Sequence, residues 1–265
     1  MKFSIIIPSY NQAEYIEQCL DSIVNQEYNN FEILIIDAQS KDGTLKIIKQ
    51  YSKEYPNLIK YISEKDSGQA DAINKGVKIS RGELITWQNC DDKYLNNNVL
   101  RDVSNIFSSD NSLKLVYGNM DLIDQNSRKI RTLKYSKVYF DSLLYEGMVL
   151  SNQCTFWKKN LHNEIGLLKN TRTDFDYEWF LRVFKVHANN TKHINKSLGA
   201  FRLHRNQKTF FKSKSDIENL NNIKISYGFN KKIKYFKLVK LKILKLIYYI
   251  KKREFVYILK KLFRL

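Results

Sequence analysis

The sequence predicts an α/β domain built on a mostly parallel central sheet with helices on its faces. Short apolar, β-branched runs alternate with segments of helical periodicity over residues 1–90, which is the pattern of repeated strand–helix–strand units. The strand-like runs are almost uninterruptedly apolar, as strands buried on both faces are. Of the 265 residues, 43% are hydrophobic and 27% are charged, so the composition excludes a disordered chain and allows a large core.

The expected elements follow one another in a regular order. Before residue 92, the apolar runs and helical periods predict strands at 3–7, 31–36, 58–62 and 83–87, and helices at 13–25, 43–55 and 69–79. After residue 92 the pattern is mixed, with helices expected at 99–107 and 175–186 and strands at 113–117, 120–123 and 193–201. Because no Pro/Gly/Ser-rich linker interrupts the chain, residues 1–225 are predicted to form one domain.

The positive charge is concentrated toward the end of the sequence. The net charge is +18, of which residues 231–265 contribute +12 and residues 1–230 only +6. A main domain that binds nucleic acid is therefore not expected. In the tail, lysines alternate with Ile, Leu, Tyr and Phe, which predicts a basic amphipathic helical element, residues 226–265, that attaches to an anionic membrane surface. The alternative is a helix packed on the main domain or on a partner chain.

Neither a leader nor a membrane span is expected. The apolar run at 3–7 ends at Pro8 and is too short for a signal peptide, and no run approaches the roughly 20 apolar residues of a spanning helix. Cys19, Cys90 and Cys154 are odd in number and widely spaced, which disfavours a disulfide framework or a zinc site and suits a reducing cytosol. The sequence thus predicts a cytoplasmic protein that lies peripherally on the inner face of the cell membrane.

Acidic side chains follow three of the predicted strands. Asp37 ends the second strand, Asp66 and Asp71 flank the start of the helix after the third, and Asp91 and Asp92 follow the fourth. The carboxyl ends of parallel strands meet at one edge of a sheet, where ligands bind. Helix capping explains an isolated aspartate equally well, but two adjacent carboxylates repel each other unless a cation or solvent offsets their charge. The pattern favours Mg²⁺ or Mn²⁺ and a nucleoside diphosphate substrate.

Three other motifs of nucleotide-binding proteins and hydrolases are missing. The turn after the first strand is Pro8-Ser9-Tyr10-Asn11 and has no glycine, so the G-x-G-x-x-G fingerprint of dinucleotide-binding folds fails. Neither a P-loop nor the G-x-S-x-G turn of α/β-hydrolases occurs. A dinucleotide-dependent dehydrogenase, a P-loop NTPase and an α/β-hydrolase are therefore disfavoured.

Six segments stand in a fixed order along the chain. They are Ile5-Ile6-Ile7-Pro8-Ser9-Tyr10-Asn11, Asp37 with Asp42-Gly43-Thr44, residues 66–76, Asn89-Cys90-Asp91-Asp92, residues 175–182, and Phe201-Arg202-Leu203-His204 with Lys208-Thr209. Together they resemble the family 2 glycosyltransferases over about residues 3–210. The resemblance implies the GT-A fold and an inverting, metal-dependent transfer of a sugar from a nucleotide-sugar, commonly UDP-linked, of the kind used in surface polysaccharide biosynthesis.

The resemblance also implies roles for individual residues. Asp92 and His204 would bind the divalent cation, Mn²⁺ or Mg²⁺. Asp176 matches the position of the base for the acceptor hydroxyl, with Asp174 as the alternative, although both also suit the positive end of a helix. Asp37 would contact the uracil or the ribose. The full set of expected donor contacts is Pro8, Tyr10, Asn11, Asp37, Gln69, Asp71, Asp91 and Lys208.

The predicted function is that of a hexosyl- or N-acetylhexosaminyl-transferase acting on a glycan or lipid-linked acceptor. A homo-oligomer is compatible with the sequence. Two alternatives stay open: sugar transfer to polyprenyl phosphate, whose enzymes often carry spanning helices, and a non-catalytic, membrane-docked module that binds a nucleotide-sugar. A nucleic-acid-binding protein is disfavoured because most of the charge lies in the tail.

Overall fold

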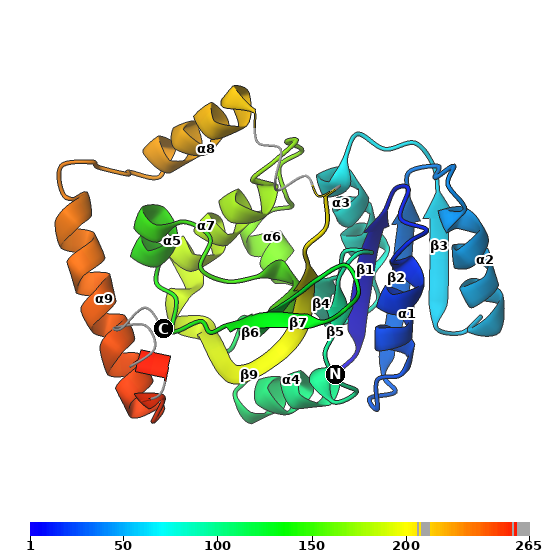
Figure 1. Cartoon of the computed structure of the whole chain (residues 1–265), viewed down its shortest axis with the longest axis horizontal. Coiled ribbons are helices and arrows are strands. Elements are labelled where there is room, and N and C mark those ends of the chain that lie inside the picture. The colour runs from blue at the N-terminus through cyan, green and yellow to red at the C-terminus, as the bar shows by residue number, and fades with distance from the viewer. Residues whose placement is uncertain (206, 208–212, 256, 259–265) are drawn as a thin grey trace.

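The computed structural model describes residues 1–205, 207, 213–255 and 257–258, so Lys208 of the last sequence motif lies outside the described residues. In this part of the chain, nine strands form a single sheet, and helices cover both of its faces (Figure 1). The strands lie in the order β3-β2-β1-β4-β8-β6-β9-β5, and β7 pairs with β6.

The N-terminal half of the sheet is a block of four parallel strands. They are β1 (Phe3–Ser9), β2 (Phe31–Asp37), β3 (Ile59–Ser63) and β4 (Leu84–Trp87). β1 pairs with β2 and β4, and β3 pairs with β2. The connecting helices are α1 (Ile16–Val24), α2 (Thr44–Glu54) and α3 (Gln69–Ile79). The predicted alternation of strands and helices is confirmed, with each boundary within three residues of its expected place.

The C-terminal half continues the sheet with mixed strand directions. β8 (Thr155–Lys158) is antiparallel to both β4 and β6 (Leu115–Ile123), and β9 (Thr191–Arg202) is parallel to β6. Hence β9 runs in the same direction as β1–β4, and its end lies at the same edge of the sheet as theirs. The short strands β5 (Lys93–Tyr94) and β7 (Lys129–Leu133) pair antiparallel with β9 and β6.

One strand prediction is wrong. The sequence predicts two strands, 113–117 and 120–123, but β6 runs without a break through Gly118. A β-carbon at Gly118 would lie 2.4 Å from Cγ of Leu198, so this glycine permits the close approach of β9. The register between β6 and β9 shifts at the same place, a local irregularity that a glycine in a strand allows.

Two hydrophobic cores, one on each face of the sheet, hold the helices. On one face α1, α2 and α4 (Val99–Ser109) pack against residues that include Ile5 and Ile7 of β1. On the other face, where Ile6 of β1 points, lie α3, α5 (Phe140–Glu146), α6 (Leu161–Ile165) and α7 (Phe175–His187). The period of two along β1 explains why adjacent residues enter different cores.

Two further helices follow β9. α8 (Lys214–Ser226) and α9 (Lys234–Lys251) extend the second core beside α5 and α7 (Figure 1). Leu241 of α9 is only 3% exposed, and Lys237 Nζ lies 2.7 Å from Asp141 Oδ2 of α5. The predicted helix in the tail is present, and one of its faces packs on the main domain. Among the described residues, no helix combines the length and the apolarity that crossing a bilayer requires.

Candidate active site

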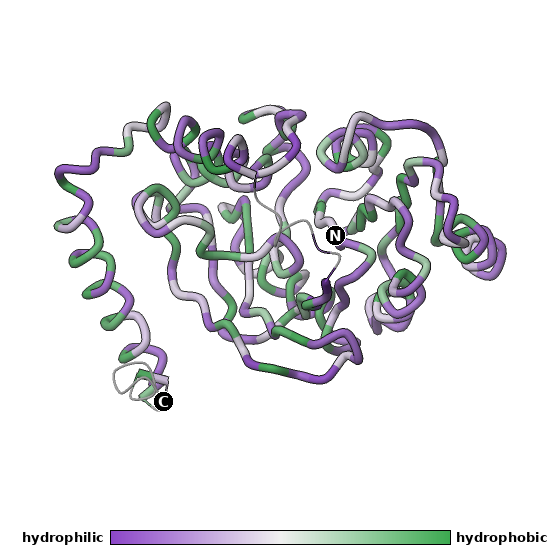
Figure 2. Tube along the Cα trace, turned by 45° about the horizontal axis from the view of Figure 1, so that its top comes forward, coloured by the Kyte–Doolittle hydropathy of each residue, from purple (hydrophilic) through white to green (hydrophobic). Residues whose placement is uncertain are grey.

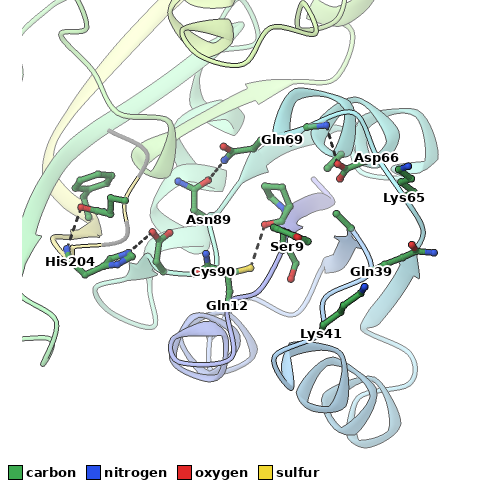
Figure 3. A pocket seen from close by; sticks show the side chains of 18 residues that line it. Ser9, Gln12, Gln39, Lys41, Lys65, Asp66, Gln69, Asn89, Cys90 and His204 are labelled. Carbon is green, nitrogen blue, oxygen red and sulfur yellow. Dashed lines mark hydrogen bonds and ion pairs between the residues drawn. The ribbon is translucent and has the colours of Figure 1, made fainter. Parts of the chain in front are cut away.

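A cavity of about 610 Å³ opens at the carboxyl edge of the sheet (Figure 3). Its walls come from the loops after β1, β2, β3, β4 and β9, and its size is typical of small-molecule sites. Five of the residues predicted from the sequence belong to this lining: Pro8, Tyr10, Gln69, Asp91 and His204. The other lining residues are Ser9, Gln12, Ala38, Gln39, Lys41, Lys65, Asp66, Gly68, Ala72, Asn89, Cys90, Phe201 and Gln207.

Asp91 and His204 lie in contact at one side of the cavity. Asp91 follows β4 and His204 follows β9, and the common direction of these strands brings together residues 113 positions apart. His204 Nε2 lies 3.0 Å from Asp91 Oδ2, and the Asp91 side chain is 18% exposed. The imidazole also packs on the ring of Tyr15, with 4.9 Å between the ring centroids. A carboxylate and an imidazole are thus held side by side at the cavity surface.

The N-terminal end of α3 contributes the neighbouring part of the lining. Gly68, with φ 127°, leads into the helix in a conformation that favours glycine, and its N–H donates to Asp66 Oδ1 at 3.0 Å. Gln69 Nε2 donates to Asn89 Oδ1 at 2.9 Å, which joins the helix to the loop after β4 (Figure 3). Because the first N–H groups of a helix carry partial positive charge, this end suits a phosphate group.

Asp92, predicted to bind the metal, lies behind the cavity instead. Its side chain is 1% exposed, and its carboxylate accepts hydrogen bonds from Gln153 Nε2 (2.6 Å), Asn89 Nδ2 (3.0 Å) and the backbone N–H of Arg202 (3.0 Å). Burial, together with the charge of Asp91, raises the pKa of Asp92 well above its ordinary value. The carboxylate therefore holds loops together, and the adjacent Asp91 is the one that faces the cavity.

Asp37 is also buried, with no exposed surface. Its carboxylate accepts hydrogen bonds from the hydroxyls of Ser9 (3.3 Å), Ser40 (2.5 Å) and Ser63 (2.7 Å), which come from the ends of β1 and β3 and the loop after β2. The predicted contact of Asp37 with uracil or ribose does not fit this position, because the lining here is formed by its neighbours Ser9 and Ala38.

Two other predicted donor contacts support loops beside the cavity. Asn11, with φ 50°, accepts the N–H of Lys41 on its Oδ1 at 2.9 Å. Asp71 Oδ2 accepts the N–H of Ser67 at 3.1 Å, and this hydrogen bond lowers the pKa of Asp71. Neither Asn11 nor Asp71 belongs to the lining.

Sequence reasoning missed two cations in the lining, Lys41 and Lys65. Figure 3 shows them on the side of the cavity away from His204, on the loops after β2 and β3. The sequence could have indicated both lysines, because Lys41 and Lys65 stand next to Asp42 and Asp66 in the loops after the second and third strands. Cys90 has a packing role: its thiol donates to the carbonyl of Pro8 at 3.3 Å, and burial raises its pKa, which makes it a poor nucleophile.

Asp174 and Asp176 lie at the start of α7, outside the cavity lining. Asp174 precedes the helix with φ 61°, and its Oδ2 accepts the hydroxyl of Thr173 at 3.0 Å. Asp176 stands in the first turn, where its Oδ1 accepts the N–H of Tyr177 at 2.8 Å. Both candidate bases are half-buried, so each keeps some access to solvent.

A family profile gives the cavity its context. The profile of glycosyl transferase family 2 matches residues 4–166, which include the loops after β1, β2, β3 and β4. The chain belongs to glycosyl transferase family 2.

Sequence similarity to individual proteins is consistent with this assignment to the glycosyltransferase family. The chain is 32% identical over 190 residues to an uncharacterised glycosyltransferase of Rickettsia prowazekii (strain Madrid E), covering 69% of this chain and 58% of that one. It is 30% identical over 222 residues to the chondroitin synthase of Escherichia coli, covering 84% of this chain and 32% of that one. The chain thus spans less than two thirds of the length of these relatives.

A solved structure confirms the predicted GT-A fold of the glycosyltransferase. S. aureus TarS, residues 1–349, in complex with UDP-GlcNAc, superposes with a TM-score of 0.70 at 21% sequence identity. The superposition covers 91% of this chain and 71% of that one.

Within the glycosyltransferase, the residues that fit a divalent cation are Asp91 and His204. Among the described residues, no group of three or more His, Cys, Asp or Glu side chains is arranged to hold a metal ion. Nucleotide sites often hold the cation with one or two protein ligands and complete its shell with phosphate oxygens. A partly exposed carboxylate beside an imidazole fits such a site, whereas the buried Asp92 does not.

Proposed function

We propose that this glycosyltransferase moves a sugar, with inversion, from a UDP-linked donor to a glycan or lipid-linked acceptor in surface polysaccharide biosynthesis. The observation that carries the proposal is one cavity into which the Asp91–His204 pair and the start of α3 both face. The complex of TarS with UDP-GlcNAc supports the choice of donor, and the likeness to chondroitin synthase supports the polymer context.

The two sides of the cavity suit the two halves of such a donor. Pro8 and Tyr10 offer flat, largely apolar surfaces to the base, and Tyr10 is 60% exposed and therefore accessible for stacking. Asp91, His204 and the start of α3 suit the diphosphate end. Lys41 and Lys65 add positive charge to the same cavity, which favours an anionic ligand.

A Mn²⁺ or Mg²⁺ ion held by Asp91 and His204 would offset the charge that grows on the diphosphate as it leaves. The chain also stabilises this charge with its own groups. Gly68 and Gln69, at the start of α3, belong to the lining, and a helix start is an anion-binding element without any metal. Together these groups would stabilise the negative charge that develops on the departing nucleoside diphosphate.

Asp176 is the proposed base. In an inverting displacement the acceptor oxygen bonds to the anomeric carbon while the bond from that carbon to the diphosphate oxygen breaks. The proton of the acceptor hydroxyl must then pass to a carboxylate within hydrogen-bond reach. Asp176 lies in the first turn of α7, where a negative charge suits the positive end of the helix, and Asp174 is the alternative.

We also propose that residues 226–265 form an attachment element, distinct from the main domain 1–225, that places the enzyme on the inner face of the cell membrane. Lys240 and Lys242 lie exposed on α9 among apolar residues, and Figure 2 shows apolar and polar positions alternating along this helix. An exposed apolar stripe with flanking lysines is typical of a helix lying in an anionic membrane surface. The large exposed apolar side chains of α9 are Tyr235, Phe236, Val239, Ile243, Leu246, Ile247 and Ile250.

The test of the donor is a thermal-shift screen of the purified protein with UDP, GDP, CDP, ADP and NAD, each with and without Mn²⁺. We expect UDP to stabilise the protein in a Mn²⁺-dependent manner, because a ligand that binds only the native state adds about 2.7 kcal/mol at a hundred times its Kd. Asp91→Asn should lose this shift. Asp110→Asn, an acid outside the cavity lining, should keep it.

Two results would contradict the proposal in different ways. A folded wild-type protein that responds to none of the nucleotides would remove the case for a nucleotide-sugar donor. A shift with GDP alone would keep the transferase and replace UDP as the donor nucleotide.

A further inference from the structure

Arg202, the last residue of β9, has no exposed surface. Burying a guanidinium is costly unless its N–H groups find hydrogen-bond acceptors. Its Nε donates to the carbonyl of Asp91 (2.8 Å) and its Nη2 to Gln18 Oε1 on α1 (2.9 Å). Its Nη1 donates to the carbonyl of Gln125 (3.1 Å) and to Ser127 Oγ (2.9 Å) in the turn between β6 and β7. One side chain therefore joins three separate elements behind the cavity.

The described acceptors of this guanidinium are all neutral. They are backbone carbonyls, one amide oxygen and one hydroxyl. Arg202 also contacts the acidic pair directly: its backbone N–H donates to Asp92 Oδ1 at 3.0 Å, and its Nε donates to the carbonyl of Asp91. Two hydrogen bonds of Arg202, one from its backbone and one from its side chain, are thus made to the loop that carries Asp91.

Arg202 also backs an aromatic stack that ends at the cavity. Its Cζ lies 4.8 Å from the ring centroid of Tyr15, and the other contact of that ring is with the imidazole of His204, at 4.9 Å. Tyr15 is 5% exposed, so its contacts with the cation and with the imidazole are made away from bulk water. A cation over an aromatic face is an attractive contact that gains strength where water is excluded. The stack therefore fixes the position of His204 from behind.

We propose that Arg202 is a positioning residue that sets Asp91 and His204 in the arrangement that binds the cation and diphosphate of the donor. It acts on Asp91 through the backbone and on His204 through Tyr15, and it does not belong to the cavity lining. A lysine cannot replace it, since one ammonium group cannot bridge acceptors on three elements in the planar geometry of a guanidinium. This inference rests on the proposed function of the cavity.

Arg182 offers a matched control on another part of the molecule. It is a partly buried arginine on α7 that donates to the carbonyls of Ile165 and Leu167 and pairs with Glu178 at 2.9 Å. None of these groups lines the cavity. Removing Arg182 therefore measures the general cost of losing a buried, carbonyl-bonded arginine, without touching the donor site.

The experiment measures the Kd of UDP in the presence of Mn²⁺ by titration calorimetry, with urea unfolding of each variant of the full chain as the measure of folding. Arg202→Met, Arg202→Lys and Tyr15→Leu are expected to raise the Kd about tenfold or more. Tyr15→Phe keeps the ring and should bind within about twofold of wild type, as should Arg182→Met. Tyr15→Leu keeps the inference testable if Arg202→Met does not fold.

Each outcome separates the inference from the function on which it rests. A folded Arg202→Met or Tyr15→Leu variant that binds UDP with Mn²⁺ as wild type does would overturn the positioning role and leave the proposed function intact. Equal losses in Arg182→Met would overturn it too, because the effect would then be general. A wild-type protein that binds no nucleotide at all would refute the proposed function itself.

Discussion

Two layers of polar residues at the carboxyl edge of the sheet have similar chemistry and different surroundings. The wall layer faces the cavity and consists of Tyr10, Gln69, Asp91 and His204. The floor layer lies behind it, with at most 1% of each residue exposed, and consists of Asp37, Asp92 and Arg202. Asp91 and Asp92 are adjacent in sequence yet fall in different layers. An aspartate in a family motif can therefore face the cavity, as Asp91 does, or hold the surrounding loops in place, as Asp92 does.

The physical difference between the layers is the use of hydrogen-bonding capacity. A buried carboxylate is tolerated only when protein groups satisfy its oxygens. Asp37 meets this condition with three serine hydroxyls and Asp92 with an amide from Gln153, one from Asn89 and a backbone N–H. Because the donors come from different loops, each floor residue fixes several loops at once. The side chains of the wall residues stay available to a ligand because the floor residues hold the backbone of the wall loops in place.

The largest expected effect is on a residue that belongs to neither layer. Asp176→Asn should lower kcat about a thousandfold, the loss typical of a missing general base, while the Kd of UDP with Mn²⁺ stays within about twofold of wild type. Turnover is measured with radiolabelled UDP-sugars and a membrane extract as the source of acceptor, and binding by calorimetry. This result would separate chemistry at α7 from binding at the wall.

Asp174→Asn is the control for this prediction. Asparagine tolerates the positive φ of 61° at this position, so the backbone that leads into α7 is preserved and only the carboxylate is lost. We expect less than a tenfold change in kcat. A thousandfold loss in Asp174→Asn together with an active Asp176→Asn would transfer the role of base to Asp174.

The N-terminal half of the fold could be predicted from the sequence because its signals are local. β1, β2 and β4 are largely apolar runs, β3 is a shorter run interrupted by Lys60, and each of the helices α1, α2 and α3 has its own amphipathic period. Parallel pairing then places the strand ends at one edge, which is how the loops that carry Pro8, Tyr10, Gln69 and Asp91 could be placed together, while the roles of these residues came from the family resemblance. The assignment of His204 came from its resemblance to a family motif.

The remainder depends on tertiary contacts that no short window of sequence contains. Gly118 can continue β6 because it has no β-carbon where Leu198 of β9 approaches closely. The four-residue strand β8 is paired on one side with β4 and on the other with β6. Whether Asp91 or Asp92 faces the cavity depends on donors as distant in sequence as Gln153 and Arg202. Burial of Arg202 could not be foreseen, since charged residues are almost always exposed.

A smaller effect is expected from cutting one floor contact. Asp37→Ala should lower the free energy of unfolding by about 2–3 kcal/mol, because it removes the acceptor shared by three hydroxyls and leaves them buried without it. Asp66→Ala, in the cavity lining with one described hydrogen bond to the N–H of Gly68, should cost less than about 1 kcal/mol. Urea unfolding at neutral pH measures both. Equal costs would mean that the floor residue Asp37 stabilises the fold no more than Asp66 of the cavity lining does.

The smallest expected effect extends the comparison to the two faces of α9. Lys237 lies on the inner face, where its ammonium donates a hydrogen bond to Asp141 Oδ2 at 2.7 Å, and this contact raises the pKa of Lys237. Lys240 is exposed on the outer face. Lys240→Gln should weaken binding to phosphatidylserine-containing vesicles about fivefold, since each lysine near an anionic surface contributes about 1 kcal/mol. Lys237→Gln removes the same charge from the packed face and should weaken vesicle binding less than about twofold.

Flotation of the full chain with such vesicles, and with phosphatidylcholine vesicles alone, measures this difference. Equal losses in the two variants would mean that net charge acts at a distance and that the outer face of α9 does not touch the lipid. Binding to neither kind of vesicle by the wild type would refute the membrane attachment and leave the exposed apolar stripe of α9 to a protein partner. A loss confined to Lys240→Gln would place the outer face of α9 on the lipid, with the ion pair of Lys237 to α5 still holding the helix against the catalytic domain.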